Sequence, residues 1–216
     1  MDYLADLVLG AQCPGCRSPG LGLCAECLPL LRAGAGAGAV GGLPLAWAAD
    51  YRTVMRAALI HAKERHALGL IPPLARLIPD ALAEIPGLAA RPPPVALLVP
   101  VPTAWAHIVE RGIDFTWELG RRGAKLAARQ GLSLRAVRAL GFTRRPADQA
   151  GLSAAERREN LRGAFRWRAP APSVPVVLLD DVVTTGATIL EARRAAQAGG
   201  AQVLGAVSLA RRLSRA

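Results

Sequence analysis

Aromatic residues are scarce in this chain, which has 216 residues but only 4% Phe, Trp and Tyr. The hydrophobic fraction of 52% is still ample for a core, which must be built mostly from Ala, Leu and Val. No apolar run reaches the roughly eighteen residues of a membrane-spanning helix, so none is expected. The start of the chain carries Asp2 and Asp6 without a basic segment, which does not fit a secretory signal. We therefore expect a cytoplasmic protein with one α/β domain and a small appendage.

Lysine is also nearly absent, because Lys63 and Lys125 are the only lysines among 27 basic residues. With 16 acidic residues, the net charge is +11. A GC-rich genome explains the preference for arginine over lysine, but it does not explain the excess of basic over acidic residues. A basic surface attracts phosphates and nucleic acids, so the composition leaves nucleic-acid contact open.

Cysteine is absent outside one short segment, where four cysteines follow the pattern C-x2-C-x7-C-x2-C: Cys13, Cys16, Cys24 and Cys27. Four thiolates satisfy tetrahedral Zn²⁺ and leave no open position, so we expect a structural zinc site. Two disulfides are the alternative, and a chain without an export signal disfavours them. Because every cysteine belongs to this cluster, the cysteine nucleophile of a glutamine amidotransferase is disfavoured. Without metal the segment has little core of its own and should be disordered.

The composition divides the chain into residues 1–32 with an N-terminal helix and the zinc module, a linker over 33–46, and a main domain over 47–216. The stretch RAGAGAGAVGG is the reason for the linker, because Gly-rich segments are flexible. In the main domain, apolar periodicity and caps predict helices over 51–67, 70–85, 104–130 with an interruption at Gly112, 154–163 and 188–197. Short apolar runs predict buried strands over 95–101, 176–179 and 203–209, and a further strand within 132–142.

The strongest motif runs from Val176 to Thr188 and reads VVLLDDVVTTGAT. Its four apolar residues fit a strand buried on both faces of a parallel sheet, and ligands bind beyond the carboxyl ends of such strands. Asp180 and Asp181 follow, and they need hydroxyl groups or a cation, because burying unpaired charge is costly. A hydroxyl-rich turn comes next: Thr184, Thr185, Gly186, Ala187 and Thr188. Glycine permits close backbone approach, threonine donates hydrogen bonds, and a helix N-terminus presents free N–H groups, so the turn predicts a phosphate site.

This block resembles the phosphoribosyl pyrophosphate (PRPP) motif of type I phosphoribosyltransferases. The resemblance implies their Rossmann-like α/β fold, a central and mostly parallel sheet flanked by helices, here behind a small zinc-ribbon-like module. It also implies that Asp180 and Asp181, as catalytic candidates, lie by the ribose hydroxyls with Mg²⁺ close at hand, and that the loop from Thr184 to Thr188 binds the 5′-phosphate. A strand, turn and helix with chance acidic residues is the alternative.

The whole pattern resembles the ComF family, which pairs a four-cysteine zinc module with such a domain. The shared motifs are Val99 to Pro102, Arg111-Gly112, Gln149 with Arg157 and Asn160, Ala164-Phe165, and the block from Asp180 to Thr188. Glutamine-dependent amidophosphoribosyltransferases place a similar V-P-V-P turn at pyrophosphate, which implies that role for Pro100 and Val101. Lys63 and Arg111 are further pyrophosphate candidates, with surface solvation as an equal alternative. One departure is clear: the family continues Arg-Gly-Phe-Asn-Gln, whereas this chain has Ile113-Asp114-Phe115 after Gly112, so this segment makes different contacts.

The ComF resemblance implies a role in natural competence, with PRPP or another ribose 5-phosphate ligand, single-stranded DNA and competence-machinery proteins as partners. Whether turnover occurs stays open. Phosphoribosyl transfer develops positive charge on the ribose C1 carbon, so a protein mainly positions groups and stabilises charge, and Mg²⁺ helps pyrophosphate leave. Thr184 stands where hypoxanthine-type transferases have an acidic residue, which disfavours that substrate. An active nucleotide-salvage phosphoribosyltransferase is the second hypothesis, and a zinc-ribbon nucleic-acid binder with a vestigial pocket is the third.

Overall fold

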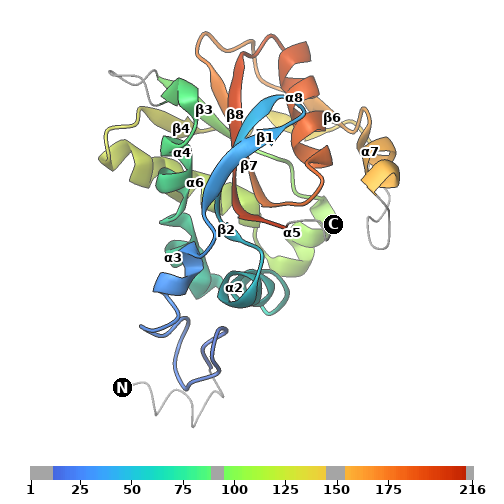
Figure 1. The fold of residues 1–216 in the computed structure, drawn as a ribbon. Coiled ribbons are helices and arrows are strands. Elements are labelled where there is room, and N and C mark those ends of the chain that lie inside the picture. The colour runs from blue at the N-terminus through green and yellow to red at the C-terminus, as the bar shows by residue number, and fades with distance from the viewer. Residues whose placement is uncertain (1–11, 89–94, 145–153, 213–216) are drawn as a thin grey trace.

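The computed structural model describes residues 12–88, 95–144 and 154–212, which build a six-stranded sheet with helices on both faces (Figure 1). The strand order is β1-β2-β8-β7-β3-β4. All neighbours in it are parallel except the antiparallel pair of β1 and β2. The bounds are β1 (Gly36–Val40), β2 (Leu43–Asp50), β3 (Ala96–Pro100), β4 (Leu134–Ala136), β7 (Val176–Val183) and β8 (Val203–Arg211). A separate antiparallel hairpin joins β5 (Leu140–Phe142) to β6 (Phe165–Trp167).

Strand β7 is one of the two central strands of the sheet, and its first residues are buried on both faces. Val177 and Leu179 belong to the hydrophobic cluster on one face, and Val176 and Leu178 belong to the cluster on the other. This alternation follows from the two-residue period of a strand, and it explains why every residue at the start of β7 is apolar. The expected buried parallel strand is therefore confirmed.

The helices cover the two faces unequally. Their bounds are α2 (Thr53–Glu64), α3 (Ile71–Ala75), α4 (Ile78–Ala83), α5 (Trp105–Arg111), α6 (Phe115–Arg129), α7 (Ala154–Leu161) and α8 (Ala187–Ala198), with short 3-10 turns at Pro29–Arg32, Leu68–Leu70 and Pro86–Leu88. Helices α2, α3, α4 and α6 supply the first cluster, and α8 with the β5–β6 hairpin supplies the second. None of the helices in the described segments combines the length and apolar character needed to cross a membrane.

The stretch predicted as a flexible linker instead forms strand structure at the edge of the sheet. Within residues 33–46, Gly36 to Val40 form β1, a tight turn follows at Gly41-Gly42, and β2 begins at Leu43. The small residues of β1 fit here because its partner strand carries the bulky Trp47, whose ring lies against Gly36, where a Cβ atom would be 2.9 Å from Cζ2. The linker prediction is wrong because the Gly and Ala residues of this stretch form a closely packed strand.

The cysteine module also packs into the main core rather than standing apart. Cys13, Cys27 and Leu31 are buried in the same cluster as Val54 and Met55 of α2. The helix expected before the module lies outside the described residues. Whether the module and the main domain fold as separate units stays a prediction, but their apolar contact is continuous.

Proline explains the one broken helix. The helix expected over 70–85 is divided into the 3-10 turn Leu68–Leu70, α3 and α4. Pro72 and Pro79 are the second residues of α3 and α4, in the first turn where a missing N–H is tolerated, and each prevents an earlier helix from continuing. The interruption predicted at Gly112 is confirmed: it ends α5 with a left-handed φ of 69°. The α/β class, the mostly parallel sheet flanked by helices and the N-terminal four-cysteine cluster are confirmed as well.

Candidate functional site

The loop from β7 to α8 has the geometry of an anion-binding turn. Gly186 is the N-cap of α8 with φ 77°, a left-handed conformation that favours glycine. The Thr185 hydroxyl oxygen accepts a hydrogen bond from the Ala187 N–H at 3.4 Å. Residues Val182 to Thr188 line a small hollow together with Asp180. The hydroxyl groups and the N-terminus of the twelve-residue helix α8 therefore face one space, as the sequence predicts for a phosphate site.

Val40 of β1, which is far from the loop in sequence and belongs to no motif, packs against Gly186. A Cβ atom on Gly186 would lie 2.1 Å from Cγ2 of Val40, the last residue of β1. Glycine is thus required twice, once by its backbone conformation and once by this close approach. Arg193 of α8 also donates a hydrogen bond to the Gly41 carbonyl at 3.0 Å, which fixes the β1–β2 turn against α8.

Asp180 lies within β7 rather than beyond its end, opposite Ser208 of β8. Its side chain is buried, and Oδ1 accepts a hydrogen bond from the Asp181 N–H at 2.9 Å. Burial, followed by the neighbouring charge of Asp181, raises the pKa of Asp180 to about 7. Near neutral pH this carboxyl group can therefore accept or donate a hydrogen bond inside the hollow.

Asp181 faces the other side of the sheet, because successive side chains of a strand point to opposite faces. Its carboxylate forms an ion pair with Lys63 of α2, and the two side chains are 16% and 22% exposed. Arg111 does not face this space freely, since its Nε donates a hydrogen bond to the Lys63 carbonyl at 3.0 Å. The structure thus brings Lys63, Arg111 and Asp181 together, while Asp180 alone of the acidic pair lines the hollow.

The V-P-V-P turn lies at the same edge of the sheet as the acidic pair. Pro100 ends β3, opposite Leu179 of β7, and the Val101 N–H donates to the Leu179 carbonyl at 2.8 Å. Both residues are buried, and Pro100 packs on Gly120 of α6, where a Cβ atom would lie 2.7 Å from the Pro100 ring. Their side chains therefore hold the strand end in place, and pyrophosphate contact through their backbone stays a prediction.

The remaining family-motif residues lie around α7. Arg157 and Asn160 belong to this helix, and Gln149 lies outside the described residues. Arg144 donates hydrogen bonds to the carbonyls of Asn160 and Arg162 at 2.8 and 3.0 Å, so it satisfies carbonyl groups at the end of α7. In the described part of the chain, these contacts are local to the hairpin and α7.

The departure at residues 113–115 has a structural explanation. Asp114 is the N-cap of α6: Oδ1 accepts from the Trp117 N–H at 3.1 Å and from the Thr103 hydroxyl at 3.0 Å. The same carboxylate is 3.5 Å from the Arg138 guanidinium, which stacks on the Trp117 ring. Phe115 is buried in the core, with the Lys63 ammonium 5.7 Å from its ring centroid. This segment therefore acts as a helix cap and as the apolar floor beneath Lys63.

An ion pair between a buried carboxylate and a half-exposed arginine, which sequence reasoning missed, ties α8 to the hairpin. Glu191 is 7% exposed and accepts a hydrogen bond from the Phe165 N–H at 3.2 Å, while Arg194 donates to the Phe165 carbonyl at 2.9 Å. Arg194 also bonds both oxygens of Glu191, at 2.7 and 2.8 Å. Only the spacing of three residues between opposite charges hints at it in the sequence, and such pairs are common on solvated helices.

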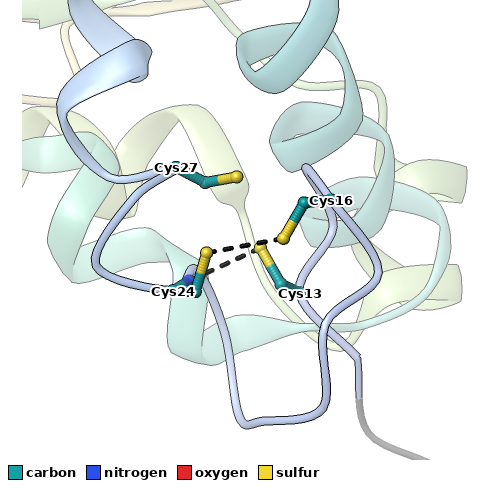
Figure 2. Close-up of side chains that lie close together, drawn as sticks. All are labelled: Cys13, Cys16, Cys24 and Cys27. Atoms are coloured by element: carbon teal, nitrogen blue, oxygen red, sulfur yellow. Dashed lines mark hydrogen bonds between the residues drawn. The ribbon is translucent and has the colours of Figure 1, made fainter.

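Figure 2 shows the four cysteine side chains converging on one point. Their sulfur atoms lie within 4.8 Å of one another, and all four cysteines are free of disulfides. Tetrahedral zinc with bonds of about 2.3 Å separates its sulfur ligands by about 3.8 Å, so this donor set fits Zn²⁺. The Cys24 N–H also donates to Cys13 Sγ at 3.4 Å, and hydrogen bonding with Ser18 lowers the pKa of Cys16 to about 6. Both contacts favour the thiolate form that binds zinc.

Comparisons with known proteins give short sequence matches. No family model matches the chain. It is 49% identical over 53 residues to the DNA utilization protein YhgH of Escherichia coli O157:H7, which is 24% of this chain and 23% of that protein. The K12 protein of the same name is 49% identical over 49 residues (23% and 22%), and that of Salmonella typhi is 48% identical over 48 residues (22% and 21%). The chain thus matches less than a quarter of the length of these relatives.

A solved phosphoribosyltransferase from Corynebacterium diphtheriae is a structural neighbour with a TM-score of 0.37 and 19% identity, over 88% of this chain and 92% of that one. A likeness at this level supports no conclusion about the site. The YhgH matches and the four-cysteine cluster are consistent with the resemblance to the ComF family.

Proposed function

We propose that this chain is a ComF-type, phosphoribosyltransferase-like protein that binds PRPP or another ribose 5-phosphate ligand and takes part in DNA uptake in the cytoplasm. The observation that carries the proposal is the left-handed Gly186 at the N-terminus of α8, in a threonine-rich loop that lines one hollow with Asp180. The loop amides and hydroxyls suit a phosphate group. The Asp180 carboxyl group suits a ribose hydroxyl beside it.

The chemistry of transfer, if turnover occurs, would rest on position and charge. Asp180 and the loop would fix the ribose phosphate, so that positive charge on the ribose C1 carbon develops near the Asp180 carboxyl group. Mg²⁺, when present, supplies charge neutralisation of the leaving diphosphate. Among the described residues, only the cysteine cluster gathers three or more His, Cys, Asp or Glu ligands. The acidic pair therefore does not fit a resident divalent site, and we expect Mg²⁺ to arrive with the ligand.

Titration calorimetry with PRPP and with ribose 5-phosphate, followed by pyrophosphate release with a panel of bases, tests this function. Asp180→Asn should weaken binding of both ligands, whereas the control Asp80→Asn, at an exposed ion pair with Arg32, should leave binding unchanged. Pyrophosphate release that Asp181→Asn abolishes would establish an active salvage enzyme. Binding without release would support a ligand-binding role, and absence of binding would refute the proposal.

A second proposal concerns DNA contact. Three arginines line a hollow of about 440 Å³ between the cysteine module and α2, namely Arg17, Arg56 and Arg65. Among the described residues that line this hollow none is acidic, and the arginines offer donors that suit phosphate groups. The name of the YhgH relatives and the net charge of +11 support a DNA strand as the ligand.

Fluorescence anisotropy with single-stranded oligonucleotides across a salt series measures this contact, because each lost phosphate contact lowers the salt slope by about 0.7 on a single strand. Arg56→Gln and Arg65→Gln should each weaken binding and flatten the slope. Arg129→Gln on α6 is the matched control. A salt slope that is flat in the unmodified protein would rule the DNA proposal out.

A further inference from the structure

Lys63 lies against Asp181, one of the two carboxylates that the family resemblance associates with Mg²⁺. It stands near the end of α2, and its ammonium group forms an ion pair with the carboxylate of Asp181. The side chains are 22% and 16% exposed, so solvent screens this pair less than it would screen an exposed one. Among the described residues, Lys63 is the one cation in an ion pair with Asp181.

Two neighbours hold Lys63 in this position. Arg111 donates a hydrogen bond to the Lys63 carbonyl at 3.0 Å, at the end of α2 where carbonyl groups lack helical partners. Phe115, which is 1% exposed, presents its ring 5.7 Å from the Lys63 ammonium. A cation between a carboxylate and an aromatic face gains from both. The lysine is thus ordered before any ligand arrives.

The donor set around Asp181 is correspondingly poor for a divalent ion. Mg²⁺ and Mn²⁺ favour six oxygen ligands in octahedral geometry, and a protein site usually offers more than one carboxylate. Here Asp180 lines the hollow on the other face of the strand, and Lys63 already pairs with Asp181. An ammonium group next to the carboxylate repels a second cation.

We propose that Lys63 is the resident counter-ion of Asp181 and that it excludes divalent cations from this carboxylate until a ligand brings one in. The role of the ligand rests on the proposed ribose-phosphate function. The exclusion itself depends only on Lys63, Asp181 and the two residues that hold the lysine. Lys63 is in this sense a positioning residue, and the sequence-based pyrophosphate role would require it to leave Asp181 first.

Electron paramagnetic resonance of free Mn²⁺ measures the exclusion on zinc-loaded protein without any phosphoribosyl ligand. Lys63→Met should gain a Mn²⁺ site, with affinity roughly tenfold or more above that of the unmodified protein. The reason is that the positive charge of the lysine, which repels Mn²⁺ at Asp181 even when partly screened by solvent, is removed. Lys63→Arg should keep the exclusion. Lys63→Met combined with Asp181→Asn should lose the new site. Lys125→Met, at the other lysine, is the matched control and should match the unmodified protein.

Circular dichroism and thermal unfolding would first establish that each variant is folded. The proposal is overturned if Lys63→Met binds Mn²⁺ no more tightly than the unmodified protein, or if the gained site survives Asp181→Asn. Ribose 5-phosphate binding is measured separately by calorimetry. Failure there would refute the proposed function and leave the Mn²⁺ result standing, so the two failures are distinguishable.

Discussion

Gly186→Ala is the perturbation that isolates the phosphate loop most directly. Gly186 has φ 77°, and a Cβ atom there would lie 2.1 Å from Cγ2 of Val40. Alanine thus introduces two separable costs, a left-handed backbone at an L-residue and a clash with β1. The substitution leaves the threonine hydroxyls and Asp180 chemically intact.

The magnitude follows from the two costs. A left-handed conformation costs an L-residue about 1–2 kcal/mol. Overpacking by one methyl group costs about 1–3 kcal/mol. The sum is a loss of about 2–5 kcal/mol in the free energy of unfolding. At roughly 2–4 °C per kcal/mol for a chain of this size, the melting temperature should fall by about 4–20 °C.

Calorimetric unfolding and ribose 5-phosphate titration would be combined in a double-mutant cycle with Val40→Ala. In the double variant the clash is relieved, so about 1–3 kcal/mol of unfolding free energy should be regained, while the cost of the left-handed backbone remains. Phosphate affinity should fall in Gly186→Ala and return only in part. An unchanged melting temperature, or additive effects with no coupling between the two positions, would refute the reasoning about β1 and the loop.

Three further predictions concern the zinc site, the buried carboxyl group of Asp180 and the departure segment, which is residues 113–115. Metal analysis should find about one Zn²⁺ per chain. Removal of the zinc by a chelator should lower the midpoint temperature of a single calorimetric transition of the whole chain, because Cys13 and Cys27 share a hydrophobic cluster with α2. A separate transition of the cysteine module at lower temperature would contradict this. The raised pKa of Asp180, about 7, means that its neutral form stabilises the fold and that this stability is lost as pH rises from about 4 to about 7. Asp180→Asn should therefore flatten urea-unfolding stability over that pH range and stabilise the protein at about pH 8, and an unaltered pH profile would disprove it. Asp114→Ala should cost about 0.5–2 kcal/mol in urea unfolding through loss of the α6 cap, while Asp114→Asn, an equally good cap, should cost little; equal losses would point to the Arg138 ion pair instead.

The local motifs of this sequence predicted the fold well wherever one face or one turn determines the structure. The apolar run at the start of β7 is required by burial on both faces of the sheet, and the glycine before α8 is required by a left-handed backbone conformation. The helix predicted from its cap to begin at residue 154 agrees with α7, which begins at Ala154. Sequence reasoning failed at β1, because the packing of Gly36 against Trp47 depends on a partner strand that composition does not reveal.

The acidic pair illustrates a different limit. Adjacent carboxylates in a motif suggest one shared site, and the strand period separates them: Asp180 lines the hollow, and Asp181 faces Lys63. The sequence could have given this separation only if β7 had been predicted to continue through both residues to Val183. Apolar Val182 and Val183 do permit such a strand, but the acidic residues favoured an earlier end.

The departure segment and the acidic pair are connected through Lys63, although they lie about seventy residues apart in sequence. Asp114 starts α6 and so places Phe115 in the core, where its ring faces the Lys63 ammonium. Arg111, just before the turn at Gly112, holds the Lys63 backbone. A polar side chain in place of Phe115 would accept a hydrogen bond from the Lys63 ammonium group and so compete with Asp181 for it. Phe115 in the segment capped by Asp114 therefore favours the lysine–carboxylate pair, and a Phe115→Asn variant should move Mn²⁺ binding in the same direction as Lys63→Met.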